Sequence, residues 1–325
     1  MYCEHFGFSE KPFEVTPDHN FLYLSPAHEE MLASIIYGIQ ERKGFITIVG
    51  EVGTGKTTLL NAAMDKLDRN TRVAYIFNTD VTFNQLLQMA LVDLGLAKAK
   101  ARLSKIDALQ RLNDFAIDQL TIGGNVALII DEAQNLDLKT LENLRLLSNL
   151  ETPKQKLVQI VLSGQPELDQ KLNQSELRQL AQRISLRRQV SPLDENQTYE
   201  YIRHRLSKVN YDGTDLFSPQ AQQLIWIYSA GVPRKINILC DNALLTAYGM
   251  RTKAIEAATI EEAVQDLGWE PGAEPRTDEQ SSATFLELLK PSPKKKTSPA
   301  RIAWILLFLA LAVTLGLWMY MEKGF

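Results

Sequence analysis

The sequence has few cysteines and histidines, and no large excess of charge of either sign. Its 325 residues include two distant cysteines, Cys3 and Cys240, and four scattered histidines. Two such cysteines exclude a disulfide-stapled scaffold and suit a reducing cytosol. The histidines lack the spacing of a zinc site. The formal net charge of −4 provides no overall attraction to nucleic acid or to anionic lipid.

The N-terminus also lacks a signal peptide, because no basic region followed by an apolar run occurs in residues 1–13. The C-terminus differs, since residues 302–320 carry no charge. As a helix this segment would span about 28 Å, close to the roughly 30 Å of a bilayer core. We therefore expect a transmembrane helix. Aromatic residues suited to the two interfaces are Trp304, Trp318 and Tyr320.

Basic residues flank this segment unequally, and basic flanks stay on the cytoplasmic side. The sequence therefore predicts a single-pass protein of the inner (cytoplasmic) membrane, with its large N-terminal part in the cytoplasm. Residues 321–325 would form a short periplasmic tail. The basic residues are Lys290, Lys294, Lys295, Lys296 and Arg301 before the span, and Lys323 after it.

Apolar, β-rich runs alternate with helix-forming stretches in the first 190 residues. Such runs, each followed by a helix, indicate an α/β fold with a parallel sheet covered on both faces. The predicted strands are 45–49, 72–77, 126–130, 157–162 and, more weakly, 186–190. The predicted helices are 57–67, 82–94, 104–120 and 138–150.

After Pro192 the strands stop, and four helical stretches follow, at 194–209, 219–230, 233–248 and 260–267. Strands that give way to helices indicate a second, all-helical domain. The chain then becomes rich in Pro, Ser, Glu and Lys, which is typical of a linker. We expect an ATPase core over 1–191, a helical lid over 192–268, a flexible linker over 269–301, the transmembrane helix over 302–320 and the tail over 321–325.

A glycine-rich segment connects the first predicted strand to the next helix. Residues 50–57 read GEVGTGKT and satisfy G-x-x-x-x-G-K-[ST], the P-loop pattern. Its backbone N–H groups and the helix N-terminus would surround phosphates, Lys56 would reach the β- and γ-phosphates, and Thr57 would ligate Mg²⁺. The predicted ATP-binding residues are Gly50, Glu51, Val52, Gly53, Thr54, Gly55, Lys56, Thr57 and Thr58.

Two carboxylates, Asp131 and Glu132, follow the predicted strand 126–130. Ligands bind at the carboxyl ends of strands in open α/β sheets. Asp131 would hold Mg²⁺ through water, and Glu132 would polarise a water for attack on the γ-phosphate. An acidic pair could also cap the next helix, but the P-loop makes the catalytic interpretation the stronger one. The pair favours hydrolysis over phosphate binding alone.

Two other classes of nucleotide-binding protein are excluded. No N-K-x-D sequence occurs, which argues against a guanine-specific GTPase. Residues 162–165 read LSGQ, but this segment lacks the second glycine of the signature of transporter ATPases. It also follows the Asp131 strand instead of preceding it.

A basic segment over residues 177–190 has two open interpretations. One of its arginines could reach the γ-phosphate of a neighbouring subunit, or the segment could be a solvated face or a phosphate-contacting patch for DNA. Arg234 in the helical domain could close over the nucleotide from above. The candidate arginines of the segment are Arg178, Arg183, Arg187 and Arg188.

The order of these motifs, together with the opening residues 5–39 and the segments LIIDEAQNL, VLSGQPEL and GVPRKIN, resembles the ExeA/GspA family. The resemblance covers about residues 1–267. It implies an AAA+ ATPase with a helical lid, a homo-oligomer, and a role in general secretion, MSHA pilus biogenesis or exopolysaccharide export. It further implies an inner-membrane or periplasmic partner from the envelope system that is served.

The resemblance also assigns roles to single residues. It makes Arg183 the arginine finger, Gln165 the polar sensor of the γ-phosphate with Ser163 as second choice, and Arg234 the lid arginine. It implies that the N-terminal segment up to Tyr37, Gly38 and Ile39 helps enclose adenine.

Secretion members carry a peptidoglycan-binding domain after the membrane span, whereas this sequence continues for five residues. Direct peptidoglycan binding is therefore not expected. The same core resembles ATPases that assist DNA transposition, so a DNA-dependent ATPase is the alternative function, although the anchor and the acidic net charge argue against nucleic acid. A nucleotide-dependent scaffold is the third possibility.

Overall fold

A computed structural model describes residues 2–270 except 17, 78, 100–102, 212, 214 and 215. The predicted linker from residue 271 onward, the transmembrane helix 302–320 and the tail 321–325 lie outside these residues. Within the described residues, no helix combines the length and the apolar character needed to cross a membrane.

Five parallel strands form one sheet in the order β2-β3-β4-β1-β5, which confirms the predicted parallel sheet. Strands β1, β3 and β4 are buried along their whole length, as expected for apolar runs covered on both faces. The strands are β1 (Phe45–Gly50), β2 (Thr71–Ile76), β3 (Asn125–Ile130), β4 (Val158–Gly164) and β5 (Ile184–Val190).

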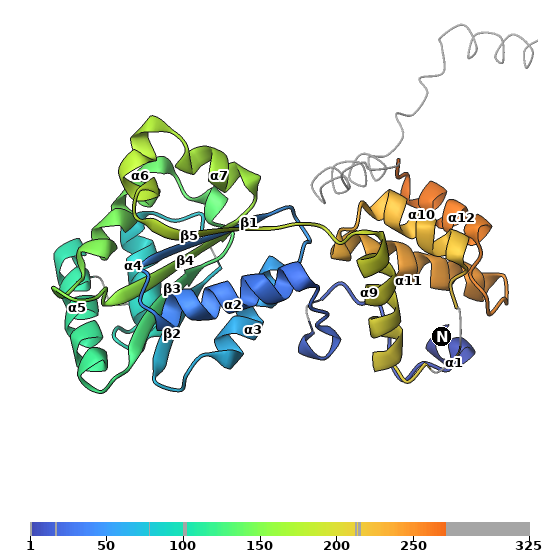
Figure 1. Cartoon of the computed structure of the whole chain (residues 1–325), viewed down its shortest axis with the longest axis horizontal. Coiled ribbons are helices and arrows are strands. Elements are labelled where there is room, and N and C mark those ends of the chain that lie inside the picture. The colour runs from blue at the N-terminus through green and yellow to red at the C-terminus, as the bar shows by residue number, and fades with distance from the viewer. Residues whose placement is uncertain are drawn as a thin grey trace, which may run out of the picture. The chain divides into compact units, whose positions relative to one another are not determined.

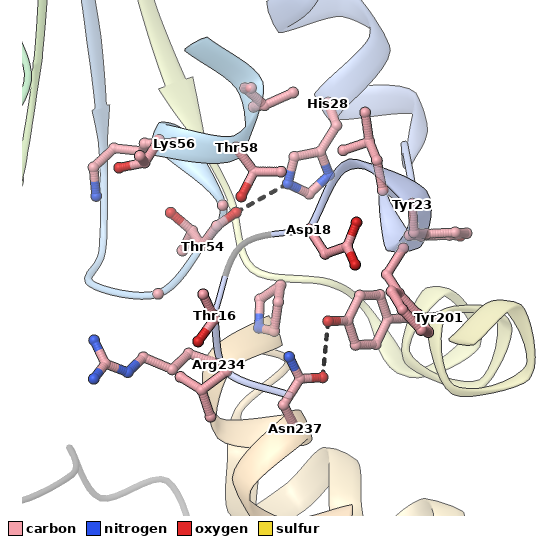
Figure 2. Close-up of a pocket in the computed structure, with 18 of the residues that line it drawn as sticks. Thr16, Asp18, Tyr23, His28, Thr54, Lys56, Thr58, Tyr201, Arg234 and Asn237 are labelled. Atoms are coloured by element: carbon pink, nitrogen blue, oxygen red, sulfur yellow. Dashed lines mark hydrogen bonds between the residues drawn. The ribbon is translucent and has the colours of Figure 1, made fainter. Parts of the chain in front are cut away.

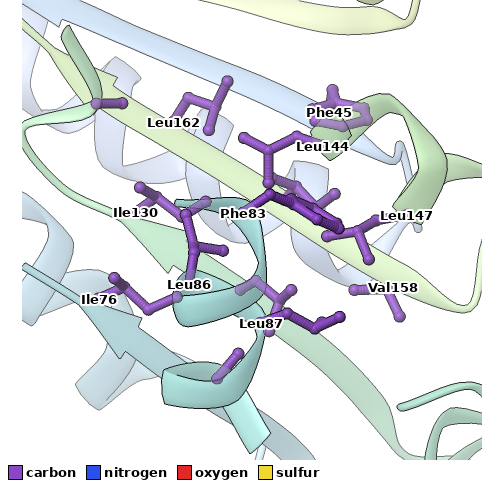
Figure 3. Packing of buried hydrophobic residues seen from close by; sticks show 14 of the residues in the cluster. Phe45, Ile76, Phe83, Leu86, Leu87, Ile130, Leu144, Leu147, Val158 and Leu162 are labelled. Atoms are coloured by element: carbon purple, nitrogen blue, oxygen red, sulfur yellow. The ribbon is translucent and has the colours of Figure 1, made fainter. Parts of the chain in front are cut away.

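Helices cover both faces of this sheet (Figure 1). Successive residues of a strand belong alternately to the apolar clusters on the two faces. On one face Ile46 and Ile129 pack against helices α2 and α3; on the other, Phe45 and Ile130 pack against helices that include α4, α5 and α6. Figure 3 shows Phe83, Leu86 and Leu87 of α4 lying against the second face. The helices of this part are α2 (Pro26–Gln40), α3 (Lys56–Lys66), α4 (Phe83–Asp93), α5 (Lys105–Thr121), α6 (Leu138–Leu144), α7 (Pro166–Leu172) and α8 (Arg178–Ala181), with short 3₁₀ helices η2 (Ala133–Asn135), η3 (Arg145–Asn149) and η4 (Ser175–Leu177).

Four longer helices follow β5 and form the predicted lid, with an apolar cluster of their own. The N-terminal segment packs into that same cluster, although the predicted domain boundaries placed it in the core over residues 1–191. Phe6, Phe8 and Phe13 of this segment are buried there beside Ile236 and Phe217. The elements are α9 (Glu195–Lys208), α10 (Pro219–Ser229), α11 (Pro233–Gly249) and α12 (Ala257–Leu267), with α1 (Tyr2–Phe6) and η1 (His19–Phe21) in the N-terminal segment.

The chain passes between the sheet part and the lid twice. At the first passage Leu22 and Leu24 pack on the sheet cluster, while the intervening Tyr23 packs on the lid cluster. At the second, Val190 belongs to the sheet cluster and Leu193 to the lid cluster, where Leu193 N donates to Gly231 O at 2.9 Å. Helix α2 starts directly after the first passage, and residues of the N-terminal segment line one cavity with the loop that follows β1 and with Glu132, which follows β3.

Candidate functional site

The glycine-rich loop lies between β1 and α3, as the sequence predicted. Gly53 and Gly55 have φ angles of +81° and +94°, in the left-handed region that favours glycine. A Cβ on Gly53 would lie 2.6 Å from the Cβ of Arg234 in the lid. The loop therefore needs glycine at position 53 both for its backbone conformation and for the approach of α11.

Lys56 is the first residue of α3, and its side chain turns back into the loop. Its Nζ donates to Gly50 O at 2.7 Å and to Glu51 O at 2.9 Å. The side chain is buried, and this burial lowers the pKa of the ammonium, with Glu132 and Asp131 the largest opposing influences. A cation thus lies where the loop and the N-terminus of α3 converge.

Thr57 and Asp131 come together although they are far apart in the sequence. The Thr57 hydroxyl donates to Asp131 Oδ2 at 2.6 Å, and Tyr75 OH donates to the same oxygen at 3.1 Å. Ser163, at the end of β4, donates to Asp131 Oδ1 at 2.7 Å. The Ser163 hydroxyl is completely buried and is used by its hydrogen bond to Asp131. Of the two predicted sensors, Gln165 is therefore the better placed to contact a γ-phosphate.

The hydroxyl and carboxylate of this pair fit the chemistry of Mg²⁺. This ion prefers oxygen ligands, and it keeps several waters while binding one or two protein groups and substrate phosphates. The described residues contain no group of three or more His, Cys, Asp or Glu that could hold a metal by themselves. Thr57 and Asp131 would therefore hold Mg²⁺ together with a bound phosphate.

Glu132 has a φ angle of +51°, which is uncommon for a residue with a side chain. Its Oε2 accepts from Gln134 Nε2 at 2.6 Å and from Gln165 Nε2 at 3.2 Å. Gln134 Oε1 in turn accepts from the backbone N–H of Gln165 at 3.1 Å. The predicted base and the predicted sensor are thus neighbours, joined by a glutamine that the sequence did not single out.

A cavity of about 460 Å³ opens between the glycine-rich loop, the N-terminal segment and the lid (Figure 2). Lys56, Thr57 and Glu132 line it from the sheet part, and Arg234 lines it from α11. The backbone N–H of Arg234 donates to Gly53 O at 3.2 Å, which places the lid directly on the loop. Other lining residues are Val15, Thr16, Asp18, Phe21, Leu22, Tyr23, His28, Tyr201, Arg205 and Asn237.

The prediction for the far end of the N-terminal segment needs correction. The lining residues of the N-terminal part fall between Glu14 and His28, whereas Tyr37, Gly38 and Ile39 are not among the lining residues. Ile39 is completely buried, and a Cβ on Gly38 would collide with Ile46 of β1. These three residues lie near the end of α2, where Gly38 and Ile39 pack against the sheet and Tyr37 is exposed.

The candidate arginines of the basic segment lie outside this cavity. Arg183 donates to Ser148 Oγ and, at 3.0 Å, to Asn149 Oδ1. Arg187 forms an ion pair with Asp169 at 2.8 Å, and Arg188 donates to Ser34 Oγ at 3.0 Å. Arg178 is exposed. The finger role, in which one of these arginines reaches the nucleotide of another subunit, stays a prediction.

Comparison with known proteins agrees with this architecture. Residues 39–172 match the family described as "AAA domain". General secretion pathway protein A of Aeromonas hydrophila is 40% identical over 267 residues, which cover 82% of this chain. The chain spans 48% of that relative's length.

Solved structures show the same fold. The ORC2 protein of Aeropyrum pernix, solved as ADPNP–ADP complexes, has a TM-score of 0.58 at 14% identity, over 77% of this chain and 72% of that one. Cdc6p of Pyrobaculum aerophilum has a TM-score of 0.59 at 20% identity, over 77% and 71% of the two chains. At such identities the similarity shows the fold alone.

Proposed function

From the premise that this chain is an AAA domain protein similar to General secretion pathway protein A, we propose that it binds ATP with Mg²⁺ and hydrolyses it to ADP and phosphate. The observation that carries the proposal is the convergence of Lys56, the Thr57–Asp131 pair and Glu132 at one cavity. The ADPNP–ADP complexes of the ORC2 protein agree with a nucleotide in this fold. We retain the predicted division into a core over 1–191 and a lid over 192–268.

The proposed chemistry follows from where these groups lie. Backbone N–H groups of the loop and the N-terminus of α3 hold the phosphates, and Lys56 moves from the loop carbonyls to the β- and γ-phosphates. When bound, Mg²⁺ neutralises the charge that develops on the phosphate oxygens. Glu132 orients a water in line with the γ-phosphate and takes its proton as the bond between the β–γ bridging oxygen and the γ-phosphorus breaks. Gln165 senses the γ-phosphate beside it, and Arg234 closes from the lid.

The cellular role that we propose is the assembly or energising of a secretion, pilus or polysaccharide-export system of the cell envelope. Its support is the printed name of the relative, General secretion pathway protein A. We also propose that residues 302–320 anchor the chain in the inner membrane with the ATPase in the cytoplasm, supported by the uncharged run and its basic flank. The partners would be further copies of this chain and a component of that envelope system.

Turnover of the purified protein tests the ATPase proposal. Lys56→Ala should abolish tight ATP binding, because the phosphates lose a charge-assisted donor. Glu132→Gln should retain ATP binding and lose turnover. Lys66→Ala, at the exposed end of the same helix α3, is the matched control and should behave as wild type. Wild-type hydrolysis by Glu132→Gln would refute its assignment as the base.

The same assay separates the alternatives. Turnover that requires added double-stranded DNA would favour the DNA-dependent ATPase, and ATP binding without measurable turnover would favour a scaffold. We expect basal turnover that DNA leaves unchanged.

The anchor is tested by removing the residues after Pro299. The truncated protein should leave the membrane fraction of cells while keeping near-normal basal ATPase activity. A protease added outside intact spheroplasts should leave the ATPase of the full chain uncut. Cleavage of the ATPase from outside would overturn the proposed topology.

A further inference from the structure

His28, in the first turn of α2, contacts the phosphate-binding loop with its side chain. Its Nε2 lies 3.0 Å from the backbone oxygen of Thr54, and its Nδ1 lies 2.7 Å from Ser25 Oγ. The ring is buried, it lines the cavity, and Figure 2 shows it directed at the loop. The P-loop pattern does not include this residue, because it lies 26 positions before Thr54.

The partners of the ring define its protonation. The carbonyl oxygen of Thr54 only accepts hydrogen bonds, so Nε2 must carry the proton and donate it. In the neutral ring Nδ1 then accepts, and the Ser25 hydroxyl donates to it. Ser25 also caps α2 by accepting from His28 N at 3.4 Å. The Thr54 carbonyl therefore selects the tautomer that donates to the loop, and the Ser25 hydroxyl completes the hydrogen bonding of the ring.

The contact with Thr54 has a geometric consequence for the next N–H group. In a trans peptide the C=O and the N–H point in opposite directions, so a donor that holds the Thr54 carbonyl also fixes the direction of the Gly55 N–H. Gly55 is the N-cap of α3, where the backbone N–H has no partner within the helix. Such N–H groups bind phosphate at the start of a P-loop helix.

We propose that His28 is a positioning residue that holds the Thr54–Gly55 peptide with its N–H directed at the phosphates of the nucleotide. The inference deepens the proposed function and rests on it, since it assumes that a nucleotide polyphosphate occupies the loop. It also connects nucleotide affinity to the N-terminal segment, because α2 begins where that segment leaves the lid.

Binding of ADP and of adenosine to the full-length protein tests the proposal. His28→Ala should weaken ADP binding about ten-fold, the effect of misdirecting one hydrogen bond to an anion. The affinity for adenosine, which has no phosphate, should stay within about two-fold of wild type. His28→Gln places an amide donor near the position of Nε2 and should recover most of the ADP affinity. Hydrogen exchange of the peptide that covers residues 51–59, measured without nucleotide, should accelerate in His28→Ala and not in His28→Gln.

Two controls separate positioning from general destabilisation. Ser104→Ala removes an equivalent serine cap from α5, where Ser104 accepts from Asp107 N at 3.1 Å away from the cavity, and it should leave ADP affinity unchanged. The inference is wrong if His28→Ala binds ADP as wild type, if it loses adenosine equally, or if His28→Gln is as weak as His28→Ala. If the wild type binds no nucleotide, the proposed function fails, and the exchange data alone decide whether His28 holds the loop.

Discussion

Glu132 depends on the side chain of Gln134 for its direction. Gln134 donates to the carboxylate and is itself fixed by the Gln165 N–H, so it connects the end of β3 to the end of β4. Lys171 holds the same turn by donating to Gln134 O at 2.6 Å. A carboxylate that takes a proton from water needs this alignment. A general base raises the reaction rate about 10²–10⁴-fold only when it is held within hydrogen-bonding distance of that water.

Gln134→Ala should therefore lower kcat about ten-fold or more with little change in ATP affinity, measured by steady-state turnover and by nucleotide titration. The exposed Gln179→Ala is the control and should match wild type. Gln134→Glu keeps the shape but places a second negative charge beside Glu132, so it should be no better than Gln134→Ala. An unchanged kcat in Gln134→Ala would show that Glu132 needs no such support.

The burial of His28 predicts a dependence of stability on pH. Burial lowers the pKa of its ring, partly opposed by the hydrogen bond to Thr54 O. Near pH 6.5 the unfolded chain therefore binds a proton that the folded protein does not bind. The free energy of unfolding consequently falls as the pH drops below about 6.5. Urea unfolding at pH 8 and at pH 5.5 should show a smaller decrease for His28→Gln than for wild type.

His204 contributes with the same sign, because burial and Lys208 lower its pKa as well. It remains in both proteins, so the difference between wild type and His28→Gln isolates His28. Equal decreases in the two proteins would contradict the assignment.

At the residue scale, the sequence predicts those site residues that belong to a short sequence motif. Lys56 and Thr57 lie in one octapeptide, and Asp131 and Glu132 end one apolar strand, so chain order alone places them. His28 and Tyr75 act on residues 26 and 56 positions away, respectively. Neither belongs to a local pattern, and only packing brings them to the loop and to Asp131.

At the scale of elements, the N-terminal segment is fastened to the lid by Arg205 of α9. Its Nε donates to Pro12 O at 2.6 Å and its Nη2 donates to Glu14 O at 3.2 Å, while Tyr201 OH accepts from Nη1 at 2.8 Å. The guanidinium also lies 4.8 Å from the centre of the Phe21 ring. One buried cation of the lid thus binds the segment that lines the cavity, in addition to the apolar contacts of that segment.

Arg205→Met keeps the length of the side chain and removes every donor. It should destabilise the protein by about 1–3 kcal/mol in urea unfolding, because the buried Pro12 carbonyl loses its partner, whereas Glu14 O still accepts from Asn237. It should also weaken ATP binding, because the lining residues between Glu14 and Tyr23 lose their position at the cavity. Arg203→Met, an exposed arginine on the same helix, should change neither quantity. If Arg205→Met matched that control, the segment would be held by its apolar contacts alone.

The sequence predicts these elements unequally, for physical reasons. Buried strands have an apolar run as their signature, so β1 and β3 are found within a residue of their bounds. Helix α2 was not predicted, although Ser25 and Pro26 form a typical helix start. The packing of the N-terminal segment on the lid could not be predicted, because its aromatic residues suit any apolar cluster equally well.

At the scale of the whole molecule, the position of Arg183 outside its own cavity leads to a test of assembly. If Arg183 completes the site of a neighbouring copy, Arg183→Ala should slow hydrolysis about 10³-fold or more without weakening ATP binding. Mixing Arg183→Ala with Glu132→Gln should restore activity, since some sites then combine an intact base with an intact arginine. Specific activity should also rise with protein concentration.

A structural role of Arg183 is tested separately by Ser148→Ala, which removes one of its partners in the same chain and leaves the arginine in place. This variant should stay active. Activity of Arg183→Ala equal to wild type, or independent of concentration in a verified monomer, would refute the proposed finger.

The two passages of the chain between the sheet part and the lid limit how these parts can move. A body tethered through one flexible point can rotate about three axes, whereas two separate tethers leave rotation only about the line that joins them. Residues 22–24 and 190–193 are two such tethers, with side chains fixed in both clusters. The lid should therefore rotate relative to the sheet part about one axis, which passes through both tethers, so that a single angle describes its opening and closing. One bound nucleotide can then set that angle.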